Sequence, residues 1–124
     1  MEIIELNNKD LKTNDIESAA IIFIESQSKE MSLLEFSEKC IRTKDKNDNF
    51  TIGPWHGDSV FSKQITEMDF WVRTNIKEYL EINTNVKRNN VRTVFCFWDE
   101  WNNTFHTLEL KNGEFYGIFW CTTA

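Results

Sequence analysis

The last third of the chain, residues 91–124, constrains the fold more than any other segment. Apolar and polar residues alternate there in three runs of strand length, at about 91–98, 104–111 and 114–122. Asn112-Gly113 separates the last two runs and is the dipeptide that best suits a type I′ turn, which needs positive φ at both central residues. The tract therefore predicts a three-stranded antiparallel meander.

Aromatic side chains are concentrated in the same tract. They are Phe95, Phe97, Trp98, Trp101, Phe105, Phe115, Tyr116, Phe119 and Trp120. Alternation along the first run predicts that Val94, Cys96 and Trp98 face one side, and that Thr93, Phe95 and Phe97 face the other. With apolar residues on both sides, this strand is expected to be covered on both faces. The aromatic excess, without a recognisable catalytic signature, favours a domain that binds something.

The rest of the chain is mostly helical by its pattern. Asn14 with Glu17, and Ser32 with Glu35, are capping-box pairs that predict a helix over about 14–28 and a second helix starting at 32. A long central helix is expected over about 62–81, because its apolar residues step by three or four. Residues 1–6 are predicted to form a short edge strand or an ordered leader, and residues 50–52 are predicted to form a short strand.

This order of elements predicts an α+β fold in one domain over residues 1–124. Two N-terminal helices and one long central helix would pack on one face of a curved, mainly antiparallel sheet that ends in the meander. A chain of this length is large enough to bury a core without metal or disulfide links.

The charge of the chain limits which kinds of partner we expect it to bind. Its formal net charge is −6, and basic residues concentrate only at Lys87, Arg88 and Arg92. Because nucleic-acid binding needs basic clusters that displace counterions, direct nucleic-acid binding is disfavoured. An acidic surface speeds the encounter with a basic protein, so we expect a partner of that kind, although negative charge also simply keeps a protein soluble.

The cysteines and the apolar runs indicate the compartment. Cys40, Cys96 and Cys121 show no CxxC spacing and read as buried thiols in a reducing environment. The longest apolar run, residues 19–24, is too short to span a membrane, and the N-terminus has no basic leader. We expect a cytoplasmic protein without membrane contact.

The loop at residues 54–59 is the best catalytic candidate. His56, Asp58 and Ser59 supply an imidazole, a carboxylate and a hydroxyl, which are the groups of a base, an orienter and a nucleophile. Residues so close together on a loop more often satisfy backbone groups and cap the next helix, so catalysis is the weaker interpretation.

Cys96 and His106 form a second candidate pair on neighbouring strands, with Asp99 nearby. Cys96 shares a side with apolar residues, which indicates an inert buried thiol. No histidine, cysteine or carboxylate pattern has the short spacing of a metal site, so we expect neither metal nor cofactor. A pocket around His56, Asp58 and His106 would make the chain a small enzyme or ligand-binding domain, which is the alternative function.

The acidic and aromatic cluster Trp98-Asp99-Glu100-Trp101 is the leading candidate for partner binding. Tryptophan is enriched at binding hot spots, and carboxylates beside it would pair with lysine or arginine of a basic partner. Glu109 and Glu114 complete the candidate set. The alternative is that Trp98 belongs to the core, Trp101 covers a sheet edge, and the acids only solvate a turn.

Two resemblances follow from these features. The predicted order helix, helix, strand, helix, meander resembles the cone-shaped fold of the nuclear-transport-factor-2-like families. The short acidic domain also resembles immunity proteins of bacterial contact-dependent growth inhibition and related polymorphic toxin systems. The features that carry this second resemblance are Trp98 to Trp101 and the asparagine-rich loops at Asn7-Asn8, Asn47, Asn49, Asn89-Asn90 and Asn102-Asn103.

The second resemblance implies a stoichiometric inhibitor that binds one cognate toxin, commonly a nuclease, and covers its active site or substrate surface. It implies no catalytic residues, and hence that the protein is not an enzyme. A phage-encoded inhibitor of a nuclease defence system would show the same features. The inhibitor is the function expected from the sequence.

Overall fold

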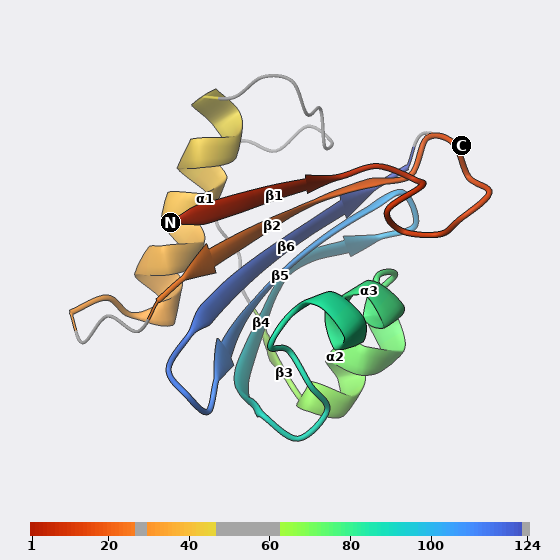
Figure 1. The fold of residues 1–124 in the computed structure, drawn as a ribbon. Coiled ribbons are helices and arrows are strands. Elements are labelled where there is room, and N and C mark those ends of the chain that lie inside the picture. The colour runs from red at the N-terminus through yellow and green to blue at the C-terminus, as the bar shows by residue number, and fades with distance from the viewer. Residues whose placement is uncertain (27–29, 47–62, 123–124) are drawn as a thin grey trace.

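The computed structural model describes residues 1–26, 30–46 and 63–122. In chain order the elements are β1 (Glu2–Leu6), β2 (Ala19–Glu25), α1 (Leu33–Lys46), β3 (Lys63–Ile65), α2 (Glu67–Arg73), α3 (Lys77–Asn83), β4 (Val91–Glu100), β5 (Asn103–Leu110) and β6 (Phe115–Cys121). The strands form one antiparallel sheet in the order β1-β2-β6-β5-β4-β3 (Figure 1). The fold class is therefore α+β, as the sequence predicts.

The C-terminal meander is confirmed, but its last turn is of another type. Leu110 N–H donates to Glu114 O (2.9 Å), and Gly113 N–H donates to Leu110 O (2.9 Å). Gly113 has a φ of 92°. Among the non-glycine residues of the described ranges, only Lys12 has a positive φ, so the φ of Asn112 is negative. The connection is therefore a type I turn followed by a left-handed glycine, which is the common three-residue hairpin loop, and not a type I′ turn.

The helix expected over residues 14–28 is wrong, because residues 19–25 of that segment form strand β2. Ile22 pairs with Ile4 of β1 on one side and with Ile118 of β6 on the other. A strand covered on both faces carries a continuous run of apolar residues, so the alternation of apolar and polar residues that identifies a strand is absent. Apolar residues in such a run also fall at helical spacing by chance. The turn before it depends on Asp15, whose Oδ1 accepts from Glu17 N–H (3.1 Å).

Helix α1 begins as predicted, with Ser32 Oγ accepting from Glu35 N–H (3.1 Å). The single long helix expected over 62–81 is wrong. Lys63–Ile65 pairs with β4 as strand β3, and the helical part is divided into α2 and α3. Thr74 ends α2 with extended backbone (φ −68°, ψ 135°), so α3 starts in a new direction. The division lets α2 bury Phe70 and Trp71 while α3 buries Leu80.

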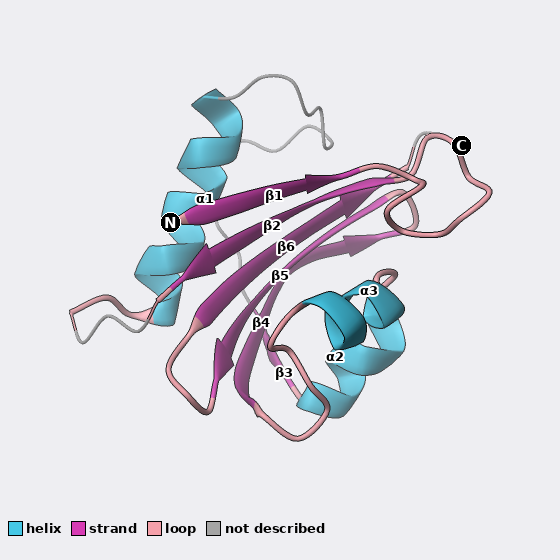
Figure 2. Ribbon diagram, viewed as in Figure 1, coloured by secondary structure: helices cyan, strands magenta, loops and turns pink. Residues whose placement is uncertain are grey.

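The helices cover both faces of the sheet, so their expected placement on one face is also wrong. Helix α1 contributes Leu33, Phe36, Cys40 and Ile41 to a core on one face. Helices α2 and α3 contribute Phe70, Trp71 and Leu80 to a separate core on the other face. Figure 2 shows the resulting three layers, with α1 on one side of the strands and the α2–α3 pair on the other. Both cores are needed because β2, β5 and β6 present buried apolar residues in both directions.

A bulge in β4 changes the side on which Trp98 lies. The register shifts between Cys96, opposite His106, and Trp98, opposite Phe105. Trp98 consequently packs against the core of the α1 face together with Phe97, and not on the side of Val94 as strict alternation predicts. None of the described helices is both long enough and apolar enough to cross a membrane.

Candidate functional site

The turn between β4 and β5 places the most exposed tryptophan of the described chain at one end of the sheet. Glu100 pairs with Asn103 across the strands, and Trp101 and Asn102 form the turn between them. The Trp101 side chain is 74 % exposed. A large aromatic ring held at the tip of a hairpin loses little conformational freedom on binding, because the strands below it are already ordered.

The two acids beside Trp101 have different environments. Asp99 forms an ion pair with Arg73 at the end of α2, and this contact raises the pKa of the guanidinium. Glu100 is exposed and makes no ion pair within the part of the chain that the structure describes. Of these two carboxylates, Glu100 is therefore the one that a basic partner reaches without breaking an ion pair of the described chain, while Asp99 anchors the turn to α2.

A second exposed apolar residue lies at the same end of the sheet. The backbone N–H of Thr122 donates to Asn102 O (2.9 Å), and its hydroxyl donates to Asp15 Oδ2. Thr122 thus joins the β4–β5 turn to the loop before β2, where Ile16 is 81 % exposed. Figure 1 shows both loops at the end of the sheet where the C-terminus lies. We call this surface, defined by Ile16, Glu100 and Trp101, the turn-end surface.

The other predicted binding residues lie elsewhere or in the core. Trp98 is half-buried, with its ring 5.1 Å from Phe105 and 5.5 Å from Phe119. Glu109 and Glu114 lie near the opposite end of β5, roughly 20 Å away by the rise of a strand. Glu114 accepts hydrogen bonds there from Asn85 (2.9 Å) and Asn112 (2.7 Å). The six predicted residues therefore do not form one continuous surface.

Sequence reasoning missed Ile16, because it placed that residue inside the helix expected over about 14–28. The signal that was available is that Ile16 stands apart from the apolar run of β2, between Asp15 and Glu17. An isolated apolar residue between two acids is typical of an exposed loop.

His106 is enclosed on the face covered by α2 and α3. Its side chain is 1 % exposed, and its ring stacks edge-on against Phe70 at 5.4 Å. Burial lowers the pKa of the imidazole to about 4; Asp99 opposes this shift and Arg73 adds to it. Nε2 is buried and has no hydrogen-bond partner in the described chain. The ring is therefore neutral at pH 7 and packs as part of the core.

The predicted Cys96–His106 pair is adjacent across the β4–β5 ladder. Burial raises the pKa of the Cys96 thiol, which keeps it protonated and unreactive at neutral pH. His56 and Asp58 lie outside the described residues, so the structure places only one member of the proposed pocket. In the described ranges no three histidine, cysteine, aspartate or glutamate side chains cluster as metal ligands would.

The thiols are free in the described chain, and Cys40 is fully buried. Burial is the main cause that raises the pKa of Cys40, and the same cause acts more weakly on Cys121. Cys121 and Cys96 are only half-buried, so the expectation of full burial holds for Cys40 alone.

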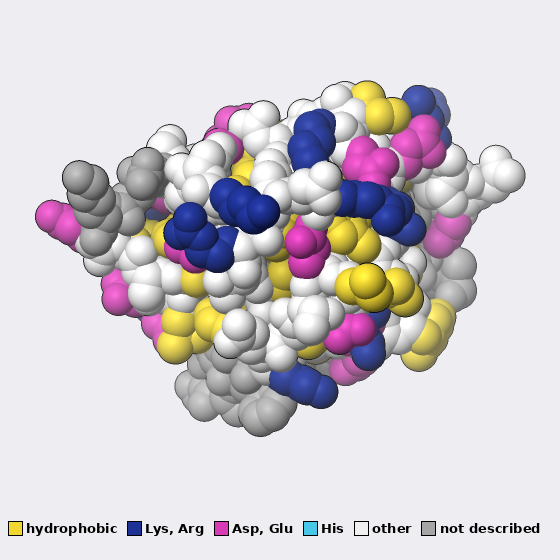
Figure 3. Space-filling view, turned by 90° about the horizontal axis from the view of Figure 1, so that it is seen from below, with side chains coloured by type: hydrophobic (Ala, Val, Ile, Leu, Met, Phe, Trp, Pro, Cys, Tyr) yellow, Lys and Arg dark blue, Asp and Glu magenta, His cyan; other side chains and the backbone are white. Residues whose placement is uncertain are grey.

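A second surface lies on the outer side of α2. Glu67, Met68, Trp71, Val72, Lys77 and Arg88 line a cavity of about 250 Å³ there. Figure 3 views this side of the molecule and shows Lys and Arg side chains gathered across it, with hydrophobic side chains exposed beside them. Sequence reasoning noted the basic residues at 87–92 but did not place them against α2, because that contact joins segments that are separated along the chain.

Comparison with known proteins adds no family to this description. The chain matches no protein-family model, no curated protein and no solved structure.

Proposed function

We propose that the protein binds a basic protein partner through the turn-end surface and acts as its stoichiometric inhibitor. In keeping with the resemblance to immunity proteins, the proposed partner is a toxin domain, most commonly a nuclease. The observation that carries the proposal is the 74 % exposure of Trp101 beside an exposed Glu100 on an ordered hairpin.

The apolar part of the turn-end surface supports binding to a protein. Trp101 and Ile16 come from separate loops that Thr122 joins, so both exposed side chains lie at the same end of the sheet. Tryptophan at the centre of an interface commonly contributes about 2 kcal/mol or more to binding when a partner covers it. Scattered single apolar residues need no such explanation, whereas a joined pair beside a carboxylate suits a docking site.

The charge supports a basic partner. The chain carries a net charge of −6, and within residues 1–26, 30–46 and 63–122 Glu100 makes no ion pair that binding would break. Opposite net charges speed association, and a nuclease domain is commonly basic because it holds a polyanion. An inhibitor that pairs with those basic groups would compete directly with nucleic acid.

The test uses the protein encoded directly upstream of this chain's gene, because immunity proteins are produced next to their toxins. The purified chain is titrated into that protein while its toxic activity is measured. We expect activity to reach zero at one equivalent. An upstream gene without a toxin domain, or activity that is unchanged by excess chain, would overturn the inhibitor proposal.

Two variants divide the contributions of charge and contact area. Glu100→Lys should slow association about tenfold at low salt and less at high salt, because exposed charges are screened beyond about 8 Å at physiological ionic strength. Trp101→Ala should instead speed dissociation by tenfold or more. Glu35→Lys and Leu34→Ala on α1 are the matched controls, since both residues are exposed on another element. Equal effects of the controls would move the interface to α1.

A further inference from the structure

The cavity beside α2 has a buried aromatic base and exposed apolar walls. Trp71 is 4 % exposed, whereas Met68 and Val72 are 76 % and 78 % exposed. Met68 and Val72 lie one helical turn apart, so they form an apolar row on the solvent side of α2. A row of this kind next to a cavity is more apolar surface than a solvent-facing helix needs.

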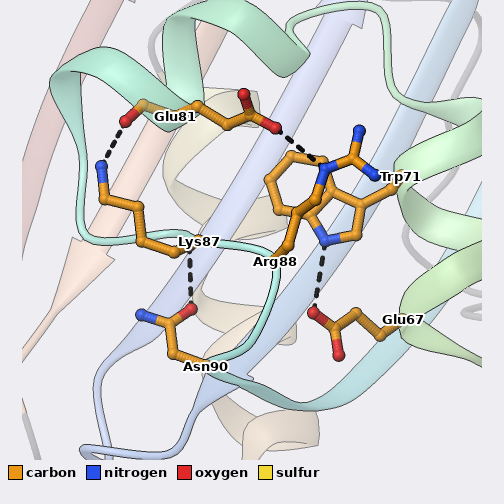
Figure 4. Close-up of polar contacts among 6 residues, drawn as sticks. All are labelled: Glu67, Trp71, Glu81, Lys87, Arg88 and Asn90. Atoms are coloured by element: carbon orange, nitrogen blue, oxygen red, sulfur yellow. Dashed lines mark hydrogen bonds and ion pairs between the residues drawn. The ribbon is translucent and has the colours of Figure 1, made fainter.

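The loop between α3 and β4 carries the positive charge of this site. Arg88 lies with its guanidinium 5.7 Å from the centre of the Trp71 ring, and its Nε donates to Glu81 Oε1 (3.3 Å). Figure 4 shows that the two terminal guanidinium nitrogens point away from Glu81. Lys77 adds a second cation to the lining.

The loop that holds Arg88 is fixed by its own hydrogen bonds. Lys87 N–H donates to Asn90 Oδ1 (2.8 Å), and Lys87 Nζ contacts Glu81 O at the end of α3. Trp71 Nε1 donates to Glu67 Oε1 (3.4 Å), which holds the indole in place from the α2 side. Arg88 and the apolar base are thus positioned before a ligand arrives, so their part of the binding costs little ordering.

We propose that this cavity, the α2 pocket, binds an acidic segment of a protein partner through one large apolar side chain and a neighbouring carboxylate. The cavity volume of about 250 Å³ is below the range of about 300–1,000 Å³ typical of small-molecule sites, and it suits one side chain. The exposed row of Met68 and Val72 continues outside the cavity, where an extended segment would lie. The carboxylate pairs with Lys77 and the terminal nitrogens of Arg88.

Charge selects this occupant over a basic one. The chain as a whole is acidic, with a net charge of −6, but the lining of the α2 pocket contains Lys77 and Arg88 against Glu67. Glu81, outside this lining, pairs with Arg88 through Nε, and the two terminal guanidinium nitrogens of Arg88 point away from it. The pocket and the turn-end surface have no residue in common and suit ligands of opposite charge. The α2 pocket is therefore a second docking site, and its occupant differs from the proposed basic toxin.

The probe is the blocked pentapeptide acetyl-Gly-Glu-Trp-Asp-Gly-amide, added to the isotope-labelled full chain in an NMR titration. We expect amide shifts in α2 and in residues 84–90, with a Kd of about 0.1–1 mM, which is typical of a short single-anchor peptide. Replacing both acids of the peptide by their amides should weaken binding about tenfold, and replacing its tryptophan by alanine should abolish it.

Val72→Asp is the decisive variant, because Val72 is exposed and its replacement leaves the core intact. We expect it to weaken peptide binding at least tenfold. Ile82→Asp is the matched control, since Ile82 is 64 % exposed on the neighbouring helix α3 and should leave binding unchanged. Backbone shifts elsewhere in both variants should match the wild type.

Three outcomes would overturn this proposal. The first is the absence of shifts in α2 at about 5 mM peptide, which is above the weakest expected Kd. The second is binding of indole-3-acetate as tightly as the peptide and with no loss in Val72→Asp, which would indicate a small-molecule site. The third is concentration-dependent sedimentation of the chain alone that Val72→Asp abolishes, which would make a second copy the occupant.

Discussion

The two faces of the sheet are covered in different ways. On the α1 face, rings stack tightly: Phe105 and Phe119 are nearly parallel with centroids 3.8 Å apart, and Phe36 lies 5.4 Å from Phe115. On the α2–α3 face, the core is mainly aliphatic, and the covering helices expose Met68, Val72 and Ile82 to solvent. One face is sealed by a single long helix, while the other is covered by two short helices with an apolar outer side.

This difference separates stability from binding. Helix α1 lies so close to the sheet that a Cβ built on Gly117 would come within 2.8 Å of Cys40 Sγ. A contact of this kind leaves little room for the helix to move against the sheet. The α2–α3 side instead combines a surface cavity, the contact of Asp99 with Arg73 and the enclosed His106. We therefore expect substitutions on the α1 face to affect folding and substitutions on the outside of α2 to affect binding.

The largest effect is expected from Phe119→Ala on the α1 face. Phe119 is fully buried and contacts the rings of Phe23, Phe105 and Trp98. Removing a buried phenylalanine ring typically costs about 3–5 kcal/mol, which is enough to unfold much of a marginal domain. Urea denaturation measures this loss in the free energy of unfolding. Val72→Ala is the control on the other side and should change the free energy of unfolding by less than about 0.5 kcal/mol. Similar losses in the two variants would remove the distinction between the faces.

The next effect is a pH dependence that belongs to the α2–α3 face. The pKa of His106 is lowered to about 4 in the folded chain, against about 6.5 when unfolded. Between pH 6.5 and pH 4 the unfolded chain binds a proton at His106 that the folded chain does not bind. The contribution of the neutral His106 to the free energy of unfolding is therefore complete above pH 6.5 and is lost as the pH falls toward 4. The loss is on the order of 3 kcal/mol.

His106→Phe tests the source of this pH dependence. The phenyl ring keeps the contact with Phe70, and it removes a buried nitrogen that has no hydrogen-bond partner in the described chain. We expect the free energy of unfolding at pH 7 to change by less than about 1 kcal/mol, because Nε2, which the substitution removes, makes no hydrogen bond in the described chain. Denaturation midpoints measured from pH 7 to pH 4 should then lose the His106 contribution. An unchanged slope in the variant would show that other groups cause it.

A smaller effect is expected from Gly117→Ala, which tests the close approach of α1. The added methyl group would overlap Cys40 Sγ, and such overpacking typically costs about 1–3 kcal/mol. Cys40→Ala removes the sulfur, so the double variant should be more stable than the sum of the two single losses predicts. Additive losses would mean that the helix is free to move away from the sheet, and that the α1 face is less rigid than its packing indicates.

Local signals predicted part of this fold, and long-range contacts decided the rest. The helix start at Ser32 and the hairpin at Gly113 are both formed within a few residues, so the sequence located their positions correctly. Strand β2 was missed because its pairing with β1 and β6 joins segments far apart in the chain. The division between α2 and α3 was missed because the apolar stripe continues through Thr74, where the chain turns to keep both helices on the sheet.

The candidate sites were likewise predicted where their residues are adjacent in the sequence and missed where their residues are far apart. The turn at Glu100 and Trp101 was predicted because the acids and the ring are adjacent in the sequence. Ile16 belongs to the same surface only through the contacts of Thr122 with two loops, which no local pattern encodes. The α2 pocket likewise depends on Arg88 lying over Trp71.

Amide hydrogen exchange on the free chain and on its complex with the partner tests the central claim most directly. The claim is that the turn-end surface, and not the α1 face, contacts the basic partner. We expect slower exchange at residues 99–103 and 13–18 in the complex, and no change at the exposed first turn of α1. Protection confined to α1 or to the sheet edge at β1, with residues 99–103 exchanging as in the free chain, would contradict the account.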